Sequence, residues 1–275
     1  MSRSKLVIRD NSTLRAQYNS LRQGDIIVGR LRLRESEESL LLDLCERNVR
    51  LIPSGLSQLV SRSKTLQTTL FAPFMLPLTC AIHTHHDLIA AISEYQKKSI
   101  TAVVTKLDRR NAGMGVHLWR SVEEVFTHAS LGNLPFPFVL QPFEAECRDI
   151  RVVALGEYIE AYWRHNPHNF RNNLHHGGQS KPCKLSAEQI KLCRQVMARG
   201  LFPYGHLDIV LTKEGKSYLG EVNLRGGIHG AQFSPEEYQL KVDAIHQQLL
   251  DDYLKSLFCL VHKKREKAKT FSLFY

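Results

Sequence analysis

The chain has 275 residues, of which 43% are hydrophobic and 23% charged, enough apolar material for one large or two modest domains with a buried core. No apolar run approaches the ~20 residues that cross a bilayer, and no apolar segment follows the basic N-terminus, so we expect neither a membrane partner nor a signal peptide. The six cysteines form no C-x-x-C pair, which argues against a zinc site or a disulfide framework and favours reduced thiols in a cytoplasmic protein.

The net charge of +10 is concentrated at the two ends of the chain. Residues 1–34 carry eight Lys or Arg against two Asp, and residues 262–269 carry five against Glu266, whereas residues 35–261 are balanced. A neutral body with basic ends does not resemble a nucleic-acid-binding face, so we do not expect a nucleic-acid partner. Binding through the ends alone is the alternative, and a steep salt dependence would reveal it.

The first part of the chain alternates strand and helix. Residues 24–29 predict a buried strand, residues 36–45 a helix and residues 48–53 a second strand. This order is typical of a small parallel α/β unit. Two prolines then interrupt the pattern, so we place the first domain at residues 1–76.

The middle of the chain predicts mixed α and β elements. The capping pattern Thr84-x-x-Asp87 begins a helix that runs to about Lys97, and Ser121-x-x-Glu124 begins a shorter one. Strands are predicted at residues 100–104, at residues 137–141 and in a hairpin over residues 151–164 that turns at Gly156–Glu157.

The last third of the chain combines a long loop with a second hairpin. Residues 165–184, rich in Asn, His and Gly, predict a loop, and ordered loops of this length are usually functional. The elements predicted after it are a helix from Ser186 to Gly200, strands at residues 207–211 and 218–223, and a final helix that begins at Pro235.

This second hairpin carries the most distinctive chemistry. Glu221 and Asn223 share one face of their strand, because side chains two apart point the same way, and the partner strand can bring Asp208 across from them. Two carboxylates and an amide oxygen suit Mg²⁺, and burying them together would be costly without a cation. The alternative is a solvated hairpin face with ordinary polar residues.

Basic residues precede the hairpin in the sequence. Lys106 stands at the end of a predicted strand, just before a small-residue loop whose backbone N–H groups can hold phosphates, although no Walker motif is present. Arg151 and Arg171 offer the planar fork of donors that binds phosphate or carboxylate oxygens. Each of these residues also has an ordinary explanation when taken singly: Lys106 as a lysine at the end of a hairpin strand, and each arginine as a member of a surface ion pair.

Seven short motifs occur in one order along the chain. They are Lys64 within Ser61–Lys64, Lys106 with residues 111–116, Gln141-Pro142-Phe143, Asp149-Ile150-Arg151, residues 170–178, Asp208, and Glu221-Val222-Asn223. This order resembles the ATP-grasp superfamily, in particular the branch of ribosomal-protein glutamate ligases and bacterial glutathione synthetases. The resemblance implies an α/β (α+β) ATP-grasp fold. A short parallel α/β domain, residues 1–76, would precede two α+β subdomains, 77–143 and 144–261, that grip ATP between them, with residues 262–275 as a basic tail.

The resemblance also implies an activity, that of a Mg²⁺-dependent ligase in which ATP activates a carboxylate as an acyl phosphate and an amine then forms an amide or peptide bond. The substrates would be a small-molecule or peptide carboxylate and an amine, and a homo-oligomer is compatible with the sequence. For the nucleotide, the resemblance implies that Lys64 and Lys106 bind the ATP phosphates under a loop through Gly113 and Gly115, that Gln141, Pro142 and Phe143 form the adenine hinge, and that Asp149 makes a further contact. For the reacting groups it implies Arg171 and Asn173, and we expect Arg151 to act with them. For the metal it implies that Asp208, Glu221 and Asn223 bind Mg²⁺, or Mn²⁺ in its place.

The chain departs from the family pattern in three places. Pro142 stands where a glutamate is usual, which removes a side-chain contact from the hinge, and residues 110–112 replace a more glycine-rich start of the phosphate loop. Arg225-Gly226-Gly227 replaces a Ser-Pro-Gly-type turn. Because glycines let a backbone approach a ligand closely, we predict that Arg225 holds a substrate carboxylate or an acyl-phosphate oxygen. These departures leave a second hypothesis open, an ATP-grasp module that binds nucleotide without turnover.

Overall fold

The computed structural model describes residues 4–110, 113–170 and 177–271, with side chains up to Phe258. The chain forms two compact units, Met1–Gly55 together with Pro235–Tyr275, and Leu56–Ser234. The domain limits predicted at residues 76 and 143 differ from this division and stay a prediction.

The first unit is built on a three-stranded parallel sheet in the order β1-β2-β3, which confirms the predicted parallel α/β unit. Ile26, Val28 and Ile52 of the sheet pack against Leu250 of the last helix. The elements are β1 (Val7–Ile8), α1 (Asn11–Gln17), a 3₁₀ turn (Tyr18–Ser20), β2 (Ile26–Val28), α2 (Ser39–Glu46), β3 (Arg50–Ile52) and α8 (Pro235–Phe271). The short elements β1 and α1 were not predicted.

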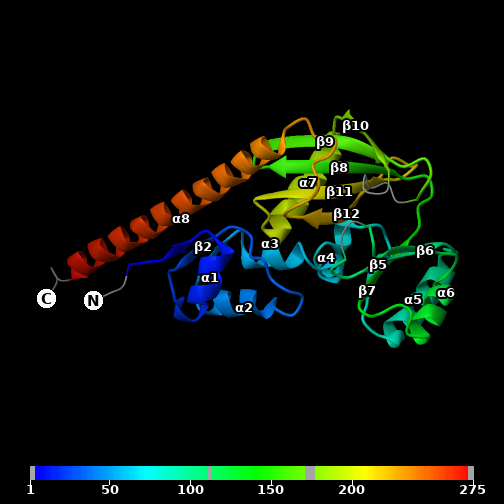
Figure 1. Cartoon of the computed structure of the whole chain (residues 1–275), viewed down its shortest axis with the longest axis horizontal. Helices are drawn as coiled ribbons and strands as arrows, with labels where there is room; N and C mark the ends of the chain where they lie inside the picture. The colour runs from blue at the N-terminus through cyan, green and yellow to red at the C-terminus, as the bar shows by residue number, and fades with distance from the viewer. Residues whose placement is uncertain (1–3, 111–112, 171–176, 272–275) are drawn as a thin grey trace. The chain divides into compact units, whose positions relative to one another are not determined.

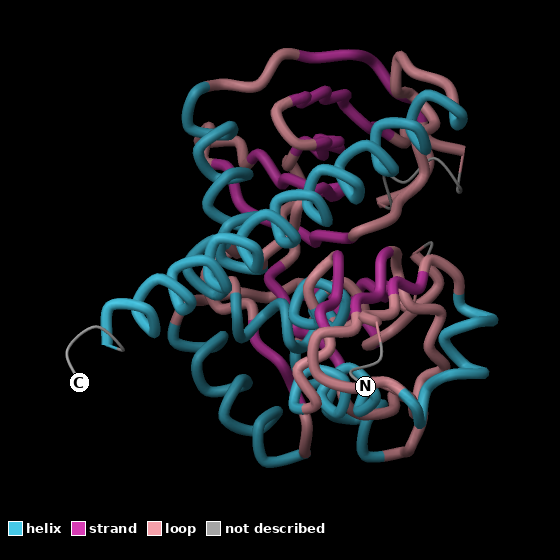
Figure 2. The backbone as a smooth tube through the Cα atoms, turned by 90° about the vertical axis from the view of Figure 1, so that its left-hand side faces the viewer, coloured by secondary structure: helices cyan, strands magenta, loops and turns pink. Residues whose placement is uncertain are grey.

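Helix α8 is one uninterrupted helix that continues through residues 262–271, the greater part of the predicted basic tail (Figure 2). Its apolar contacts to β2 and β3 come from Leu250, with Leu249 and Tyr253 partly buried beside it. Although α8 is long, no helix within the described residues is long and apolar enough to cross a membrane.

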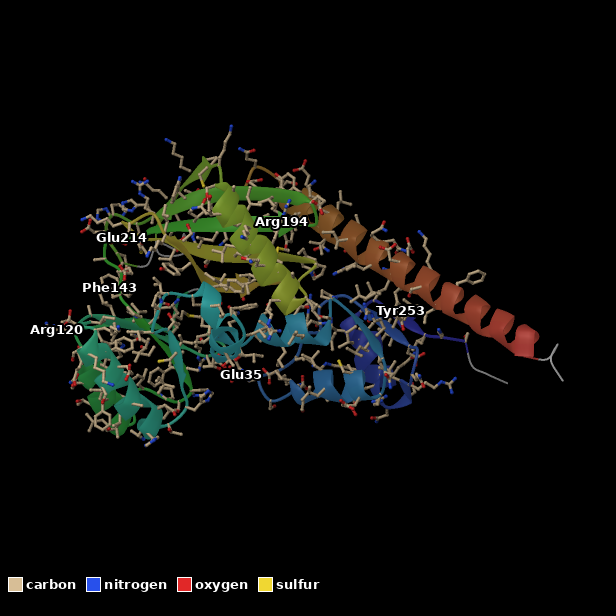
Figure 3. All side chains as sticks on the ribbon, turned by 180° about the vertical axis from the view of Figure 1, so that it is seen from behind. Glu35, Arg120, Phe143, Arg194, Glu214 and Tyr253 are labelled. Atoms are coloured by element: carbon tan, nitrogen blue, oxygen red, sulfur yellow. The ribbon has the colours of Figure 1, made fainter. Side chains whose placement is uncertain are left out.

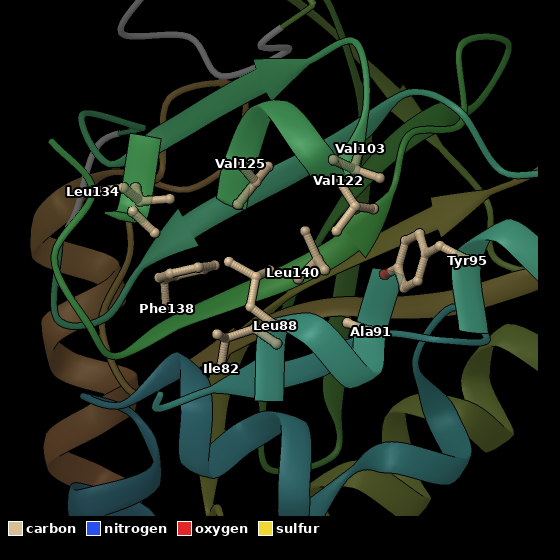
Figure 4. Close-up of a cluster of buried hydrophobic side chains, with 11 residues drawn as sticks. Ile82, Leu88, Ala91, Tyr95, Val103, Val122, Val125, Leu134, Phe138 and Leu140 are labelled. Carbon is tan, nitrogen blue, oxygen red and sulfur yellow. The ribbon is translucent and has the colours of Figure 1, made fainter. Parts of the chain in front are cut away.

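The first sheet of the second unit is antiparallel, in the order β4-β7-β5-β6. Its strands are β4 (Cys80–Ile82), β5 (Val103–Leu107), β6 (Val116–Trp119) and β7 (Phe138–Pro142). Helices α5 (His85–Lys97) and α6 (Val122–Ser130) pack their apolar sides on it, with Leu88, Val125 and Phe138 among the residues of the core (Figure 4). Both helices begin at the predicted caps, Thr84 and Ser121.

The second sheet of this unit is also antiparallel, in the order β10-β9-β8-β11-β12 (Figure 1). Its strands are β8 (Arg148–Leu155), β9 (Tyr158–His165), β10 (Gln179–Cys183), β11 (Tyr204–Leu211) and β12 (Ser217–Asn223), and α7 (Ala187–Gly200) contacts β11 and β12. Both predicted hairpins are confirmed. The prediction of a continuous loop over residues 165–184 is wrong for residues 179–183. This edge strand contains Pro182 and exposes most of its side chains, so it lacks the alternation that marks a half-buried strand.

Three short helical elements precede the first sheet of this unit and were not predicted: α3 (Gly55–Val60), α4 (Lys64–Leu70) and a 3₁₀ turn (Ala72–Phe74). Ser63 caps α4, since its hydroxyl accepts a hydrogen bond from the Leu66 N–H. Helix α4 contacts β12, as Figure 1 shows, so it lies against the strand that carries Glu221 and Asn223.

The core of the first sheet supplies a test of this packing. Leu140 is fully buried in the cluster of Figure 4, whereas Leu131, just after α6, is 69% exposed. Leu140→Ala should lower the free energy of unfolding by ~2–5 kcal/mol, because it removes buried apolar atoms and leaves a cavity. Leu131→Ala should change it by less than about 0.5 kcal/mol. Urea unfolding followed by circular dichroism measures both, and equal effects of the two variants would contradict the packing.

Candidate active site

The hairpin of β11 and β12 brings two carboxylates face to face. Asp208 pairs with Glu221 and His206 with Asn223, so all four side chains lie on one face of the sheet. The register shifts between Asp208 and Ile209, which marks a bulge beside the pair. The predicted convergence of Asp208, Glu221 and Asn223 is therefore confirmed as an arrangement of strands, and the metal-binding role of these residues stays a prediction.

Two arginines flank Asp208. The Arg151 Nε atom lies 2.6 Å from Asp208 Oδ1, an ionic contact without hydrogen-bond geometry, and Arg151 Nη2 donates a longer hydrogen bond to Oδ2. The Arg164 Nη2 atom lies 3.0 Å from Asp208 Oδ2. Burial by itself would raise the pKa of the Asp208 carboxyl, but the two guanidiniums outweigh it and hold this pKa below its ordinary value. Asp208 is therefore an anion at neutral pH.

Arg164 is a site residue that the sequence analysis missed. Its Nε atom donates to Asp149 Oδ1 at 2.5 Å, so one guanidinium bridges Asp149 and Asp208. Burial would lower the pKa of Arg164, yet the two carboxylates raise it. A signal for it was present in the sequence: a turn at Gly156–Glu157 sets a register in which Asp149 lies opposite Arg164, as the structure shows.

Lys64, at the start of α4, reaches the other carboxylate. Its Nζ atom lies 3.2 Å from Glu221 Oε1 and also donates to the Arg110 carbonyl at 2.6 Å. A second connection joins α4 to the same loop, because Asp108 accepts hydrogen bonds from the Thr65 N–H and the Ser63 hydroxyl. The start of the predicted phosphate loop is thus attached to the helix that carries Lys64.

Lys106 lies near the end of β5 (Val103–Leu107), which confirms its predicted place at the end of a strand. Its Nζ atom is 3.5 Å from the Gly220 carbonyl of β12. Burial lowers the pKa of its ammonium, and the negative charge of Glu221 opposes that shift. The two predicted phosphate-binding lysines, Lys64 and Lys106, therefore both reach the β12 segment 220–221.

The loop between β5 and β6 requires glycine at both predicted positions. A Cβ atom at Gly115 would lie 2.8 Å from the Cβ atoms of Leu107 and Arg110, and Gly113 has a φ of +75°. Its backbone is closed by the Leu107 N–H, which donates to the Gly115 carbonyl. The residues at 111 and 112 lie outside the described residues.

The predicted adenine hinge lies on the connection between the two sheets of the second unit. Gln141 and Pro142 end β7, and Phe143 follows on this connection (Figure 3). The Phe143 N–H donates to the Ala102 carbonyl. The Phe143 ring packs edge-to-face with the Phe170 ring, and the two ring centroids are 6.2 Å apart. Pro142 lies opposite Val103 of β5. Because proline has no backbone N–H, this position of β7 donates no hydrogen bond within the sheet.

The loop after β12 approaches the same group of charges. A Cβ atom at Gly226 would clash with Arg151 Nη1 and lie 2.8 Å from His206 Cγ, so this glycine permits close packing on both side chains. Arg225, beside it, is exposed. Two further predicted site residues, Arg171 and Asn173, lie outside the described residues.

The candidate metal ligands form a small oxygen-donor set. Among the described residues no group of three or more His, Cys, Asp or Glu side chains could hold a metal ion. Asp208 and Glu221 supply two carboxylates, and Asn223 supplies an amide oxygen on the same face. This set fits Mg²⁺, which is commonly held by one or two carboxylates together with substrate phosphates.

Comparison with known proteins identifies the family. The sequence profile of the RimK-like ATP-grasp domain matches residues 60–249, well over half of the chain, and the chain therefore belongs to this family. A probable α-L-glutamate ligase of Coxiella burnetii is 30% identical over 164 residues, which cover 57% of this chain and 52% of that protein. A protein of the same name from Sodalis glossinidius is 34% identical over 137 residues, 47% of this chain and 45% of its own length. The chain spans about half the length of the curated relatives it matches.

A solved structure with a similar fold is D-cycloserine synthetase DcsG, with a TM-score of 0.59 over 90% of this chain and 100% of that protein. At 13% identity this similarity concerns the fold alone. The family match confirms the predicted ATP-grasp fold, and this similarity agrees with its mixed α and β architecture.

His206 provides a pH-dependent test of the site. Burial, followed by the positive charge of Arg151, lowers the pKa of its imidazole from 6.5 to about 3. As the pH falls, His206 therefore takes up a proton near pH 6.5 in the unfolded state but only near pH 3 in the folded state. This contribution to stability is complete above pH 6.5 and is lost as the pH falls towards 3.

Between pH 7 and pH 5 the wild-type protein should lose ~2 kcal/mol more unfolding free energy than His206→Gln. His229→Gln, at an exposed histidine on the neighbouring loop, is the control and should behave as wild type. Urea titrations at the two pH values give the comparison, and parallel losses in all three proteins would show that His206 is not held neutral.

Proposed function

We propose that this protein is an ATP-dependent carboxylate–amine ligase. The observation that carries the proposal is the facing pair Asp208 and Glu221, with Lys64, Arg151 and Arg164 paired to them within one compact unit. Membership of the RimK-like ATP-grasp family supports the same activity. Catalysis of phosphoryl transfer depends mainly on positioning and charge stabilisation, and this arrangement supplies both without a protein nucleophile.

Asp208, Glu221 and Asn223 would hold Mg²⁺, for which Mn²⁺ can substitute. When bound, the cation offsets negative charge on the phosphate oxygens of ATP. Lys64 and Lys106 would bind the phosphates from two different elements, beneath the loop through Gly113 and Gly115. Gln141, Pro142 and Phe143 would line the adenine side through backbone groups, and Asp149 would contact the nucleotide further along.

The reaction proceeds in two steps in this proposal. A carboxylate oxygen of the first substrate takes the γ-phosphoryl group, so that an acyl phosphate and ADP form. The amine nitrogen of the second substrate then attacks the carbonyl carbon, phosphate leaves, and the nitrogen loses a proton. Arg151 and Arg225 would offset charge on the acyl phosphate, together with Arg171 and Asn173.

The relatives named probable α-L-glutamate ligases support an α-amino acid as one substrate. We propose that the other is a small-molecule or peptide substrate, and that one of the two supplies the carboxylate and the other the amine. The different turn at Arg225-Gly226-Gly227 supports a different acceptor from that of proteins with a Ser-Pro-Gly turn.

Phosphate release tests this function directly. The protein is incubated with ATP and Mg²⁺ and a panel of amino acids, including glutamate, with peptides and amines, and the products are weighed by mass spectrometry. We expect release that requires both a carboxylate and an amine, with a product lighter than the two substrates by one water. Nucleotide binding with no release for any pair would favour the alternative, a nucleotide-binding module without turnover.

Lys106→Ala should weaken ATP binding at least tenfold, because removing one partner of a desolvated charge pair typically costs ~2–5 kcal/mol. Lys106→Arg should not restore it, since a planar guanidinium is larger than an ammonium. Lys97→Ala, at the exposed end of α5, is the control. Calorimetry with a non-hydrolysable ATP analogue decides the matter, and unchanged affinity in Lys106→Ala would remove Lys106 from the nucleotide site.

Glu221→Gln should raise the Mg²⁺ concentration for half-maximal turnover by about tenfold or more, equivalent to ~1.4 kcal/mol, because one negative ligand is lost. Glu214→Gln changes an exposed residue in the turn of the same hairpin and should have no effect (Figure 3). A magnesium titration of initial rates compares the two. Identical curves for Glu221→Gln and wild type would show that Glu221 does not bind the metal.

A further inference from the structure

Gln67 of α4 is a buried amide with an unusual set of partners. Its side chain is 1% exposed, and its Nε2 atom donates to the Val60 and Val222 carbonyls, each at 2.9 Å. Its Oε1 atom accepts a hydrogen bond from the Val222 N–H, also at 2.9 Å. One side chain therefore satisfies both backbone groups of a single residue 155 positions away.

Val222 lies between the two predicted metal ligands of β12, Glu221 and Asn223. Strand β12 is an edge of its sheet, with β11 as its neighbouring strand and an isolated bridge from Leu219 to Met75 on the open side. The N–H and C=O of Val222 point away from β11, since their partner is Gln67. The Gln67 amide thus takes the place of a neighbouring strand at this one position.

Two more contacts attach the same segment. Lys64, one turn before Gln67 on α4, pairs with Glu221, and the Ser61 hydroxyl accepts a hydrogen bond from the Leu224 N–H at 2.9 Å. Residues 61, 64 and 67 therefore hold residues 221, 222 and 224 from the open side of β12. Of these contacts, only those of Gln67 are fully buried and hold the backbone between the ligands.

We propose that Gln67 is a positioning residue, which holds β12 in the register that lets Glu221 and Asn223 bind one cation. This inference rests on the proposed function. A buried backbone group left without a partner is costly, so β12 would shift or admit water if the Gln67 amide were removed. Mg²⁺ demands near-ideal octahedral geometry, so a small displacement of its ligands would weaken binding.

The test compares two buried glutamines that both contact β12. Gln67→Met removes the amide at nearly constant volume. Gln189→Met does the same in α7, where the side chain contacts Ser217 at the far end of β12. Both variants should lose stability, but only Gln67→Met should disturb the ligand pair.

Hydrogen exchange of the folded proteins measures the attachment itself. In Gln67→Met the exchange of the Val222 amide should accelerate about tenfold or more relative to that of the Leu207 amide of β11, equivalent to ~1.4 kcal/mol. In Gln189→Met the exchange rate of the Val222 amide relative to that of the Leu207 amide should stay as in wild type. Equal acceleration of both amides in Gln67→Met would reduce Gln67 to a general stabilising residue and overturn the proposal.

Binding of Mn²⁺ in the presence of ADP, followed by electron paramagnetic resonance, measures the consequence. The dissociation constant for Mn²⁺ should rise about tenfold or more in Gln67→Met and stay within about twofold of wild type in Gln189→Met. If Gln67→Met does not fold, Ser61→Ala removes the Leu224 attachment and should weaken Mn²⁺ binding in the same direction.

Two results would contradict different claims. Equal Mn²⁺ affinity in wild type and in the folded variant of residue 67 or 61 would overturn the positioning role and leave the proposed function intact. Wild-type protein that binds no Mn²⁺ with ADP would overturn the proposed function, and the positioning role with it.

Discussion

Two carboxylates that face each other across neighbouring strands repel, and removing them from water is costly unless cations lie beside them. Asp208 and Glu221 stand in this relation, and the second unit surrounds them with positive charge. Arg151 and Arg164 hold Asp208 from within the sheet, and Lys64 holds Glu221 from α4. The start of α4, the first residues of the predicted phosphate loop and one strand of the first sheet meet β12 at this pair, through Lys64 and Lys106.

The same balance explains how the site can exchange partners. A divalent cation at Asp208 and Glu221 would compete with the cationic side chains now paired to them. In the proposed ligase, Lys64 and Arg151 would then turn to phosphate oxygens, whereas Arg164 would keep its bond to Asp149. Because His206 is held neutral beside Arg151, it adds no further positive charge to this group at neutral pH.

The sequence predicts what local patterns determine. The caps at Thr84, Ser121 and Ser186, and the turn at Gly156–Glu157, begin or join elements where expected, because each depends on residues within a few positions. The placement of Asp208 opposite Glu221 depends on the bulge between Asp208 and Ile209, because the register nearer the turn would place Gly220 opposite Asp208. The hairpin places Arg164 opposite Asp149, but its second partner, Asp208, lies on a strand that joins β8 only in the tertiary fold. The contact of Gln67 with Val222, 155 residues away, has no local pattern that could predict it. Strand β10 escaped because an exposed edge strand with a proline has no apolar alternation.

A crystal structure with ADP and Mn²⁺, with anomalous diffraction recorded at the manganese edge, tests the central claim most directly. We expect an anomalous peak within bonding distance of oxygen atoms of Asp208, Glu221 and Asn223 and of an ADP phosphate. A peak away from these three residues, or ADP bound with Asp208 and Glu221 still paired only to arginine and lysine, would contradict it.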